Sequence, residues 1–515
     1  MTRFFNTAGP CRPDKHYMLS SLRRLPELRG FIEREHYFVV HAPSQVGKTT
    51  ALLALAQELT AAGRHAAVLL SMEQGGPLGA DPGSAELAIL DAWRASTEAW
   101  LPAELQPPVW PSSSPGNRIR AALQAWAIAC PRPLVVFLDE IDALHDDTLL
   151  SVLRQIRAGY PTRPNSFPSS LALIGLRDVR DYKVASGHEG RLGTSSPFNI
   201  KAESLTLRNF TRDEVAELYA QHTAASGQRF EPAALERAFD LTQGQPWLVN
   251  ALARQLTEVL VPDLHQSIVA ADVDEATEHL IRRRDTHLDS LMDRLREPRI
   301  RSILEPMLAG DMLGDVPDDD RRFSVDLGLL RRSAQGSLEV ANPIYREIIV
   351  RTLAGGPSDS LPPIATTWLT PEGQLDEAAL LEAFLAFWRQ HGEPLLGSAP
   401  YHEIAPHLVL MAFLHRVVNG GSIEREYAIG SGRMDLCLRC AGRTLAIEIK
   451  VWRPGAADPL GKGLEQLDAY LGGLGLSSGW LVIFDRRPHA PPVAERVGHA
   501  LATTPSGRAV VVVRA

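Results

Sequence analysis

Residues 36–50 read HYFVVHAPSQVGKTT, and this stretch decides the fold of the first part of the chain. The apolar run 37–40 predicts a buried parallel strand. It leads into a loop ending in Gly47-Lys48-Thr49, and the pattern of residues 50–62 predicts an amphipathic helix directly afterwards. This order of strand, loop and helix presents unpaired backbone N–H groups at a helix N-terminus, where anionic phosphates bind. We therefore expect a phosphate-binding loop.

The residue types of this loop suit a nucleotide. Gly47 lets the backbone approach closely, Lys48 can reach the β- and γ-phosphates, and the Thr49 hydroxyl can coordinate Mg²⁺. The first glycine of the usual motif is Ala42 here, so only A-x-x-x-x-G-K-T is matched, and the alternative is a strand–turn–helix with a chance Gly-Lys-Thr. The predicted cofactors are ATP and Mg²⁺, held by Pro43, Ser44, Gln45, Val46, Gly47, Lys48, Thr49 and Thr50.

The bulk composition predicts a folded protein with several domains. The chain has 515 residues, of which 45% are hydrophobic and 22% charged, so we expect about two to four domains. The net charge of −8 argues against a generally basic nucleic-acid binder, and any such contact has to come from a local patch. No run approaches about 18 apolar residues and the first residues lack a secretory signal, so we expect a cytoplasmic protein without a membrane partner. Cys437 and Cys440 form a lone C-x-x-C whose members point to opposite faces of a strand, which disfavours a zinc or redox site.

A second nucleotide-site motif lies at residues 134–142, LVVFLDEID. The apolar run predicts a central strand, and Asp139 and Glu140 emerge at its carboxyl end, where ligands bind in open α/β sheets. Asp139 is predicted to hold Mg²⁺ through water, and Glu140 to polarise the attacking water as the catalytic base. An acidic pair after a strand is also a common helix N-cap. Its position downstream of the phosphate loop favours the Walker B interpretation.

The next strand, residues 170–176, is followed by Arg177, which is placed to sense the γ-phosphate or is a solvated loop charge. The two motifs and this strand together resemble the AAA+/STAND branch of P-loop ATPases. In particular, the segment HYFVVHAPSQVGKTTALL resembles bacterial AAA-like ATPases whose first strand reads YFV-x-x-A-P-R-Q-x-GKT. The resemblance implies a P-loop ATPase core over residues 1–204.

Residues 205–265 are expected to form a helical lid. Thr211 and Glu214 have the spacing of a helix capping box. Residues 242–250, TQGQPWLVN, resemble the G-x-P motif of STAND ATPases, which implies that Pro246 contacts nucleotide from the lid. The alternative is a Gly-Pro break that only separates two helices.

Residues 266–355 resemble the winged-helix module that follows the lid in this ATPase family. The pattern is a helical region, a hairpin around residues 335–336, and a helix over NPIYREIIVRTL. Arg331 and Arg332 could touch a nucleic-acid backbone. Because an acidic run, residues 318–320, lies close by, interdomain contact is favoured over DNA reading.

A Gly/Pro/Ser-rich linker, residues 356–373, leads to a second α/β region, residues 374–515. Strand alternation within GRMDLCLRCAGRTLAIEIKVW predicts a hairpin that brings Asp435, Glu448 and Lys450 onto one polar face. Two carboxylates beside a lysine can form a Mg²⁺ site, with Asp435 and Glu448 as the metal ligands and Lys450 assisting the attacking water. The alternative is a solvated strand face.

This pattern, D-x(12)-E-x-K, resembles the PD-(D/E)XK nuclease superfamily, which has a restriction-endonuclease-like fold. Gln466 and Tyr470 fit the Q-x-x-x-Y signature of its RecB-like members. The resemblance implies that Gln466 serves the active site and that an upstream acidic residue does too. Glu403 is the candidate, and Glu426 is a competitor.

The predicted function is therefore an ATPase that regulates a Mg²⁺-dependent nuclease, with nucleic acid, preferably DNA, as partner. By analogy of architecture the role is in prokaryotic antiphage defence, with a homo-oligomer and a protein or nucleic-acid trigger as further expectations. The alternative function is a non-nucleolytic, ATP-dependent nucleic-acid-binding or signalling switch. A ring-shaped DNA motor is less favoured because no arginine finger can be identified.

Overall fold

The computed structural model describes most of the chain, namely residues 3–177, 200–283, 286–295, 297–309, 313, 315–333, 335–360, 368, 370, 374–398, 409–411, 413–414, 422–424, 436–440, 443–487 and 490–515. The chain divides into two compact units. The first comprises Met1–His287 and Arg322–Ile344, and the second comprises Leu288–Arg321 and Tyr345–Ala515. Residues 266–355 thus contribute to both units.

The first unit is built on a five-stranded sheet in the order β2-β3-β4-β1-β5, in which every neighbouring pair is parallel. Residues in β3 and β4 are buried along their whole length, as expected for strands covered on both faces. Because the strands are parallel, their carboxyl ends meet at one edge. The strands are β1 (Tyr37–His41), β2 (Ala66–Ser71), β3 (Leu134–Asp139), β4 (Ser170–Gly175) and β5 (Lys201–Thr206).

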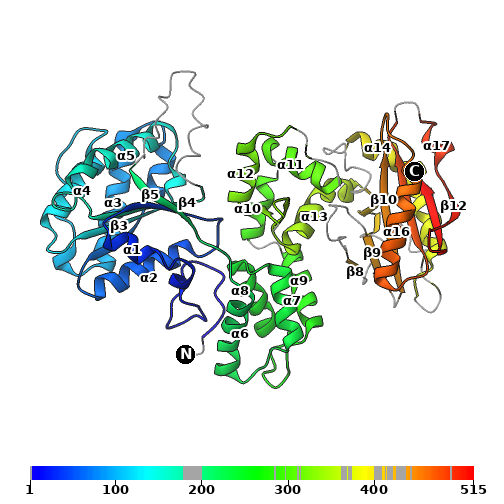
Figure 1. Cartoon of the computed structure of the whole chain (residues 1–515), viewed down its shortest axis with the longest axis horizontal. Helices are drawn as coiled ribbons and strands as arrows, with labels where there is room; N and C mark the ends of the chain where they lie inside the picture. Colours follow the sequence, from blue (N-terminus) through cyan, green and yellow to red (C-terminus); the bar gives the residue numbers. More distant parts are fainter. Residues whose placement is uncertain are drawn as a thin grey trace. The chain divides into compact units, whose positions relative to one another are not determined.

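Helices cover both faces of this sheet (Figure 1). Alternate side chains of β1 pack into two separate hydrophobic cores. Tyr37 and Val39 belong to the core on one side of the sheet, and Phe38 and Val40 belong to the core on the other side. One core includes α3 (Pro82–Trp100), α4 (Arg118–Ala129) and α5 (Asp146–Gly159), and the other includes α1 (Leu28–Glu33) and α2 (Lys48–Ala61). This arrangement of a parallel sheet between two layers of helices confirms the α/β prediction and is consistent with the predicted P-loop core. Short 3₁₀ turns are η1 (Ser21–Arg24), η2 (Glu73–Leu78), η3 (Ala103–Leu105), η4 (Ile141–Ala143) and η5 (Tyr160–Thr162).

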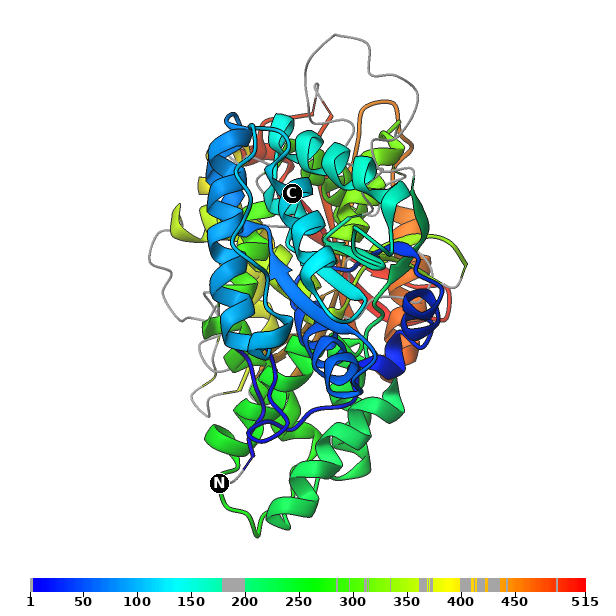
Figure 2. The ribbon, with the colours of Figure 1, turned by 90° about the vertical axis from the view of Figure 1, so that its left-hand side faces the viewer.

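A group of helices follows β5, drawn in green in Figures 1 and 2, and it keeps the name lid from the prediction. Its elements are α6 (Arg212–Ser226), α7 (Pro232–Thr242), α8 (Pro246–Gln255), the π-helical turn η7 (Leu256–Leu260) and α9 (Ala270–Arg283). The predicted capping box is present at the start of α6, where Thr211 and Glu214 bond reciprocally. Between α7 and α8 the chain turns through Gly244, which has a φ of +69°, and the Phe210 N–H donates to the Gly244 carbonyl (2.8 Å). A Cβ on Gly244 would lie 1.9 Å from the Phe210 carbonyl oxygen, so only glycine fits this turn.

Helices and one hairpin occupy residues 286–360. They are α10 (Thr286–Arg294), α11 (Pro298–Ala309), α12 (Asp318–Asp326), β6 (Leu330–Arg332), β7 (Leu338–Val340) and α13 (Pro343–Ser360). β6 and β7 pair antiparallel, and Arg331 bonds across the hairpin to Glu339. α13 runs to Ser360, so the stretch expected to begin a linker at residue 356 starts as helix.

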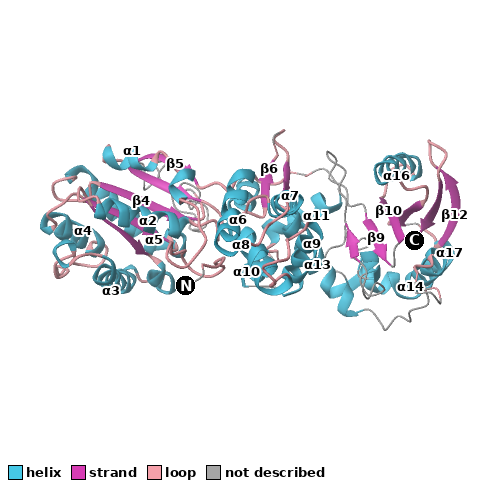
Figure 3. Ribbon diagram, turned by 90° about the horizontal axis from the view of Figure 1, so that it is seen from below, coloured by secondary structure: helices cyan, strands magenta, loops and turns pink. Residues whose placement is uncertain are grey.

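The second unit contains a six-stranded mixed sheet in the order β12-β13-β11-β10-β9-β8. Its strands are β8 (Ser422–Glu424), β9 (Leu436–Cys440), β10 (Arg443–Trp452), β11 (Gly479–Asp485), β12 (Gly498–Thr503) and β13 (Ala509–Arg514). Helix α16 (Leu460–Leu474) packs on one face through Leu467 and Leu471, whereas α14 (Glu377–Ser398) packs on the other, with the Trp388 and Phe484 rings 4.6 Å apart (Figure 3). The short helix α17 (Val493–Arg496) precedes β12. Among all the described helices, none has the length and apolar character needed to cross a bilayer.

Candidate nucleotide site and a buried acidic site

The phosphate loop joins β1 to α2 with two residues in the left-handed region, Gln45 (φ +64°) and Gly47 (φ +94°). Glycine is needed at position 47, both for this φ and because a Cβ there would lie 3.2 Å from the Arg24 guanidinium. Ala42 is buried and its φ is not positive, so the motif's first glycine can be replaced by alanine without backbone strain. The Lys48 ammonium donates to the Ala42 carbonyl (2.7 Å) and the Pro43 carbonyl (3.0 Å).

The two predicted motifs meet at the carboxyl edge of the sheet. The Thr49 hydroxyl donates to Asp139 Oδ2 (2.7 Å), and Asp139 is only 4% exposed. Burial raises the pKa of Asp139, although the Thr49 hydrogen bond and the nearby Lys48 oppose that rise. Burial lowers the pKa of Lys48, against the attraction of Asp142, Asp139 and Glu140. Thr49 and Asp139 therefore offer adjacent oxygen ligands of the kind that Mg²⁺ prefers, and they fit the predicted metal.

Glu140 lies directly after Asp139 in a left-handed conformation (φ +59°). Its Oε2 accepts a hydrogen bond from the Ser71 hydroxyl at the end of β2 (2.6 Å), while its N–H donates to Asp139 Oδ1 (3.0 Å). Burial raises the pKa of Glu140, and the Ser71 hydrogen bond lowers it. The carboxylate is thus held by a neighbouring strand.

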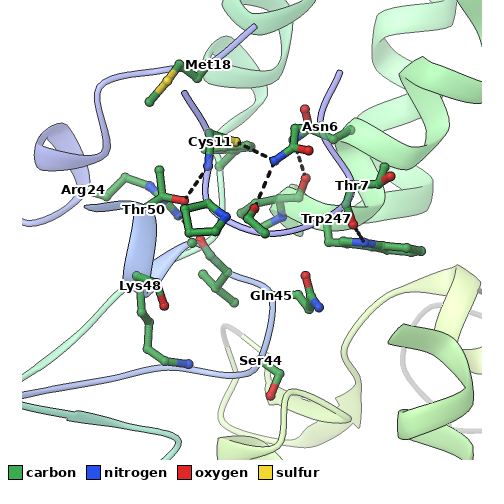
Figure 4. A pocket seen from close by; sticks show the side chains of 18 of the residues that line it. Asn6, Thr7, Cys11, Met18, Arg24, Ser44, Gln45, Lys48, Thr50 and Trp247 are labelled. Carbon is green, nitrogen blue, oxygen red and sulfur yellow. Dashed lines mark hydrogen bonds between the residues drawn. The ribbon is translucent and has the colours of Figure 1, made fainter. Parts of the chain in front are cut away.

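A cavity of about 500 Å³ opens above the phosphate loop, a size typical of a small-molecule or cofactor site (Figure 4). Its lining includes Ser44, Gln45, Val46, Gly47, Lys48, Thr49 and Thr50 of the predicted loop, with Asp139, Glu140 and, from the lid, Pro246, Trp247 and Asn250. Pro43 is not part of this lining, and it takes part only through its carbonyl bond to Lys48.

Part of the N-terminal segment between residues 6 and 19 also lines the cavity, and none of its residues was among the predicted site residues. The Cys11 N–H donates to the Thr50 hydroxyl (3.1 Å), and the Trp247 indole donates to the Thr7 carbonyl (2.9 Å), as Figure 4 shows. The Gln221 side chain of α6 bonds both backbone groups of Met18 (3.3 and 2.9 Å). The segment therefore connects the P-loop helix to the lid.

Arg177 does not line this cavity, in contrast to its predicted contact with nucleotide. Its guanidinium forms an ion pair with Asp326 of α12 (3.2 Å), and the two side chains are only 8% and 17% exposed. It also lies over the Phe323 ring, 5.1 Å from the centroid. A carboxylate and an aromatic ring together stabilise a buried guanidinium, so this placement has a physical reason, and a contact of Arg177 with nucleotide stays a prediction.

The second unit carries a separate buried acidic group. Glu448 on β10 is fully buried and forms a close ion pair with Lys450. In the parallel register with β11, Glu448 and Lys450 lie beside Leu481 and Ile483, two residues of the core under α16. The predicted shared face of Glu448 and Lys450 is therefore the face that α16 covers.

Glu448 Oε2 on β10 is a buried oxygen without a hydrogen-bond partner in the described part of the chain. Gln466 Oε1 on α16, the helix that covers this face, is another such buried oxygen. A buried carboxylate oxygen without a donor is costly, so the site suits a cation or a polar ligand. Within the described residues, no group of three or more His, Cys, Asp or Glu side chains could hold a metal ion.

The predicted partners of Glu448 cannot be placed. Asp435, Glu403 and the competitor Glu426 lie outside the described residues. The described pairing of β9 with β10 ends at Leu436 opposite Ile447, one residue after Asp435. These three residues remain predictions.

Comparisons with known proteins gave no family model and no curated protein that matches the sequence. The fold is similar to the Walker-type ATPase PABY2304 of Pyrococcus abyssi, with 14% identity, 67% of this chain and 99% of that chain covered, and a TM-score of 0.46. It is also similar to the Thermotoga maritima RuvB Holliday junction branch migration motor (17%, 63% and 92%, 0.35) and to Cdc6p of Pyrobaculum aerophilum (13%, 68% and 94%, 0.37). At such scores these similarities are too remote to indicate an activity.

Proposed function

We propose that the first unit is an ATPase that binds ATP with Mg²⁺ and hydrolyses it. The single observation that carries this proposal is the 2.7 Å bond between Thr49 and Asp139 at the floor of the cavity, because it joins the two motifs that hold a nucleotide's metal and phosphates. Bound Mg²⁺ would neutralise charge on the phosphates. Lys48 leaves its carbonyl partners to contact the β- and γ-phosphates, and the loop N–H groups hold the phosphate oxygens.

Glu140 then acts as the base that orients and deprotonates the attacking water. In the structure its Oε2 accepts a hydrogen bond from the Ser71 hydroxyl, which turns the carboxylate toward β2. Ser71 would thereby reduce the fraction of time in which Glu140 faces the attacking water, and so restrain hydrolysis of bound ATP.

Two substitutions test the ATPase. Lys48→Ala should abolish ATP binding in calorimetry, whereas Glu140→Gln should bind ATP and release no phosphate. Lys462→Ala, an exposed lysine on α16, is the matched control and should behave as the wild type. Normal ATP binding by Lys48→Ala would refute the proposed nucleotide site.

A second activity is favoured by a different observation, the buried Glu448 carboxylate that pairs with Lys450 and keeps an oxygen without a donor. We propose that the second unit is a Mg²⁺-dependent PD-(D/E)XK nuclease in which Asp435 and Glu448 hold the metal and Lys450 and Gln466 assist. A carboxylate pair with a metal ion lowers the pKa of the attacking water and stabilises the scissile phosphate. Glu403 is the further acidic residue of this proposal.

The nuclease proposal is tested with labelled DNA and RNA, with and without ATP and Mg²⁺. Glu448→Ala should lose Mg²⁺-dependent cleavage, and Glu465→Ala, which removes an exposed carboxylate of α16, should keep it. If Glu448→Ala cleaves as well as the wild type, the chain is better explained as a non-nucleolytic switch that binds nucleic acid or protein.

The regulatory part of the proposal joins the two activities. In a STAND-like ATPase, the bound nucleotide would set the conformation of a winged-helix segment, residues 266–355. This conformation would in turn control the nuclease. A role in prokaryotic defence, a homo-oligomeric form and a molecular trigger belong to the same proposal. Stimulation of cleavage by ATP, lost in Lys48→Ala, is the result that supports it.

A further inference from the structure

Arg24 is a buried cation that no sequence motif singled out. It ends the turn η1, is only 8% exposed and lines the nucleotide cavity. In the described part of the chain it makes no ion pair with a carboxylate. Burial lowers the pKa of its guanidinium to about 10. A charge with so little solvent persists only where other groups stabilise it.

The groups that stabilise Arg24 come from two different parts of the first unit. One guanidinium nitrogen, Nη1, donates both to the Val46 carbonyl of the phosphate loop (3.0 Å) and to the Arg208 carbonyl (2.9 Å). The guanidinium also lies 4.8 Å from the centroid of the Phe210 ring. Gly47, the next residue of the loop, would place a Cβ only 3.2 Å from Nη2.

Arg208 and Phe210 belong to the connection between β5 and α6, which is the hinge between core and lid. This connection is fixed to the lid, because the Arg208 side chain bonds both carboxylate oxygens of Glu214 (2.6 and 2.9 Å) at the start of α6. In addition, the Phe210 N–H donates to the Gly244 carbonyl in the turn between α7 and α8. Pro246, two residues after Gly244, lines the cavity. The connection is therefore bonded to the lid both at the start of α6 and at the turn between α7 and α8.

We propose that Arg24 is a positioning residue that couples the phosphate loop to the lid, so that phosphate binding at Val46-Gly47 fixes the lid over the cavity. A single cation holds one carbonyl on each side of the hinge, and a displacement of either carbonyl strains the bond to the other. Phosphates that bind the N–H groups of the loop also fix the position of the Val46 carbonyl. Because Arg24 is bonded to this carbonyl and to the Arg208 carbonyl, it then restrains the connection between β5 and α6 as well. The inference rests on the proposed ATPase function.

Arg24→Met removes the shared donor and keeps the apolar length of the side chain. Arg23→Gln is the matched control, because Arg23 also joins the N-terminal segment to the lid, through Glu217 (2.7 Å), but at an exposed position away from the loop. Hydrogen exchange of α8 is measured with and without ATP and Mg²⁺, in a Glu140→Gln background that prevents turnover. Calorimetry gives the affinity for ATP.

We expect ATP to protect α8 from exchange in the parent and in Arg23→Gln. In Arg24→Met this protection should be lost and affinity should fall about tenfold, within the range of allosteric coupling. Arg24→Lys keeps the positive charge but lacks the planar guanidinium, so it should retain part of the protection of α8 and part of the affinity for ATP. A role only in stability would lower the melting temperature and leave the ATP-dependent protection intact.

The outcomes separate the two proposals. If the parent does not bind ATP, the ATPase proposal fails. If the parent binds ATP and Arg24→Met retains both affinity and protection, only the coupling by Arg24 fails. Should Arg24→Met not fold, Arg24→Gln, whose shorter neutral side chain removes the shared cationic donor, decides, and wild-type affinity with wild-type protection in that variant overturns the coupling.

Discussion

Replacing Ser71 by alanine should accelerate ATP hydrolysis. The Ser71 hydroxyl holds Glu140 Oε2 at 2.6 Å, which keeps the proposed base turned toward β2. A hydrogen bond to an ionised acceptor contributes roughly 1.5–3 kcal/mol. Because Glu140 as a whole is open to solvent, although its carboxylate is partly desolvated, we take about 1 kcal/mol. That energy corresponds to a change of about fivefold in the population of Glu140 free to face the attacking water. The kcat of Ser71→Ala should therefore rise by about fivefold.

The same substitution should change the pH dependence. Burial raises the pKa of Glu140, and the Ser71 hydrogen bond opposes that rise. As a base, Glu140 must be ionised, so hydrolysis is lost as the pH falls through its pKa. Without Ser71 this pKa rises further, and the acid limb of the kcat profile should move to higher pH.

The assay is steady-state phosphate release at saturating ATP over a range of pH. Ser71→Thr keeps a hydroxyl at the position and is the matched control, expected to resemble the wild type. A kcat for Ser71→Ala at or below the wild-type value, with an unchanged melting temperature, would refute the argument that this bond restrains the base.

Two further predictions concern stability. Gly244→Ala forces a side chain into a left-handed turn and against the Phe210 carbonyl, so it should lower the free energy of unfolding by about 3 kcal/mol or more, measured by hydrogen exchange of the lid. Gly227→Ala, also at positive φ but with open space around it, is the control and should cost about 1 kcal/mol; equal losses would contradict the steric explanation. Lys450→Met strands the buried Glu448 charge and should destabilise β10 and β11 by about 3–5 kcal/mol in the same measurement. Adding Glu448→Gln to Lys450→Met removes the unpaired charge and should recover most of the lost stability. If Lys450→Met alone is as stable as the wild type, the argument from a buried unpaired charge is contradicted.

Strands β1 to β4 of the first unit were predictable because their signals are local, whereas the sequence of β5, KAESLT, is polar and only its end was expected. Runs such as residues 37–40 and 134–138 are apolar without interruption, as strands buried on both faces must be. The side chains that follow them, Thr49 and Asp139, meet because parallel strands end at one edge. Neither inference needs knowledge of distant contacts.

The N-terminal part of the cavity could not be predicted in this way. Cys11 meets Thr50 through a backbone N–H, and Thr7 meets Trp247 through a carbonyl, so the residue types of Cys11 and Thr7 carry no signal for these contacts. The ion pair of Arg177 with Asp326 joins positions 149 residues apart. Only the tertiary fold determines which of many carboxylates an arginine meets.

For the second unit, the period of a strand was enough to place Glu448 and Lys450 on one face. Their burial beneath α16 was not foreseen, since alternation alone does not show which face a helix covers. Burial matters for the chemistry, because a solvated strand face would leave Glu448 hydrated and indifferent to a cation.

The closeness of Gly244 to the Phe210 carbonyl offers a way to recognise distant relatives of this chain. Motifs for phosphate binding recur across many unrelated ATPases, and they say little about descent within that large group. A position where only hydrogen fits, opposite a particular backbone oxygen, should keep glycine wherever the same crossing of the chain is kept. Superposed structures that keep glycine at this crossing, whatever their other residues, are the homologues to seek.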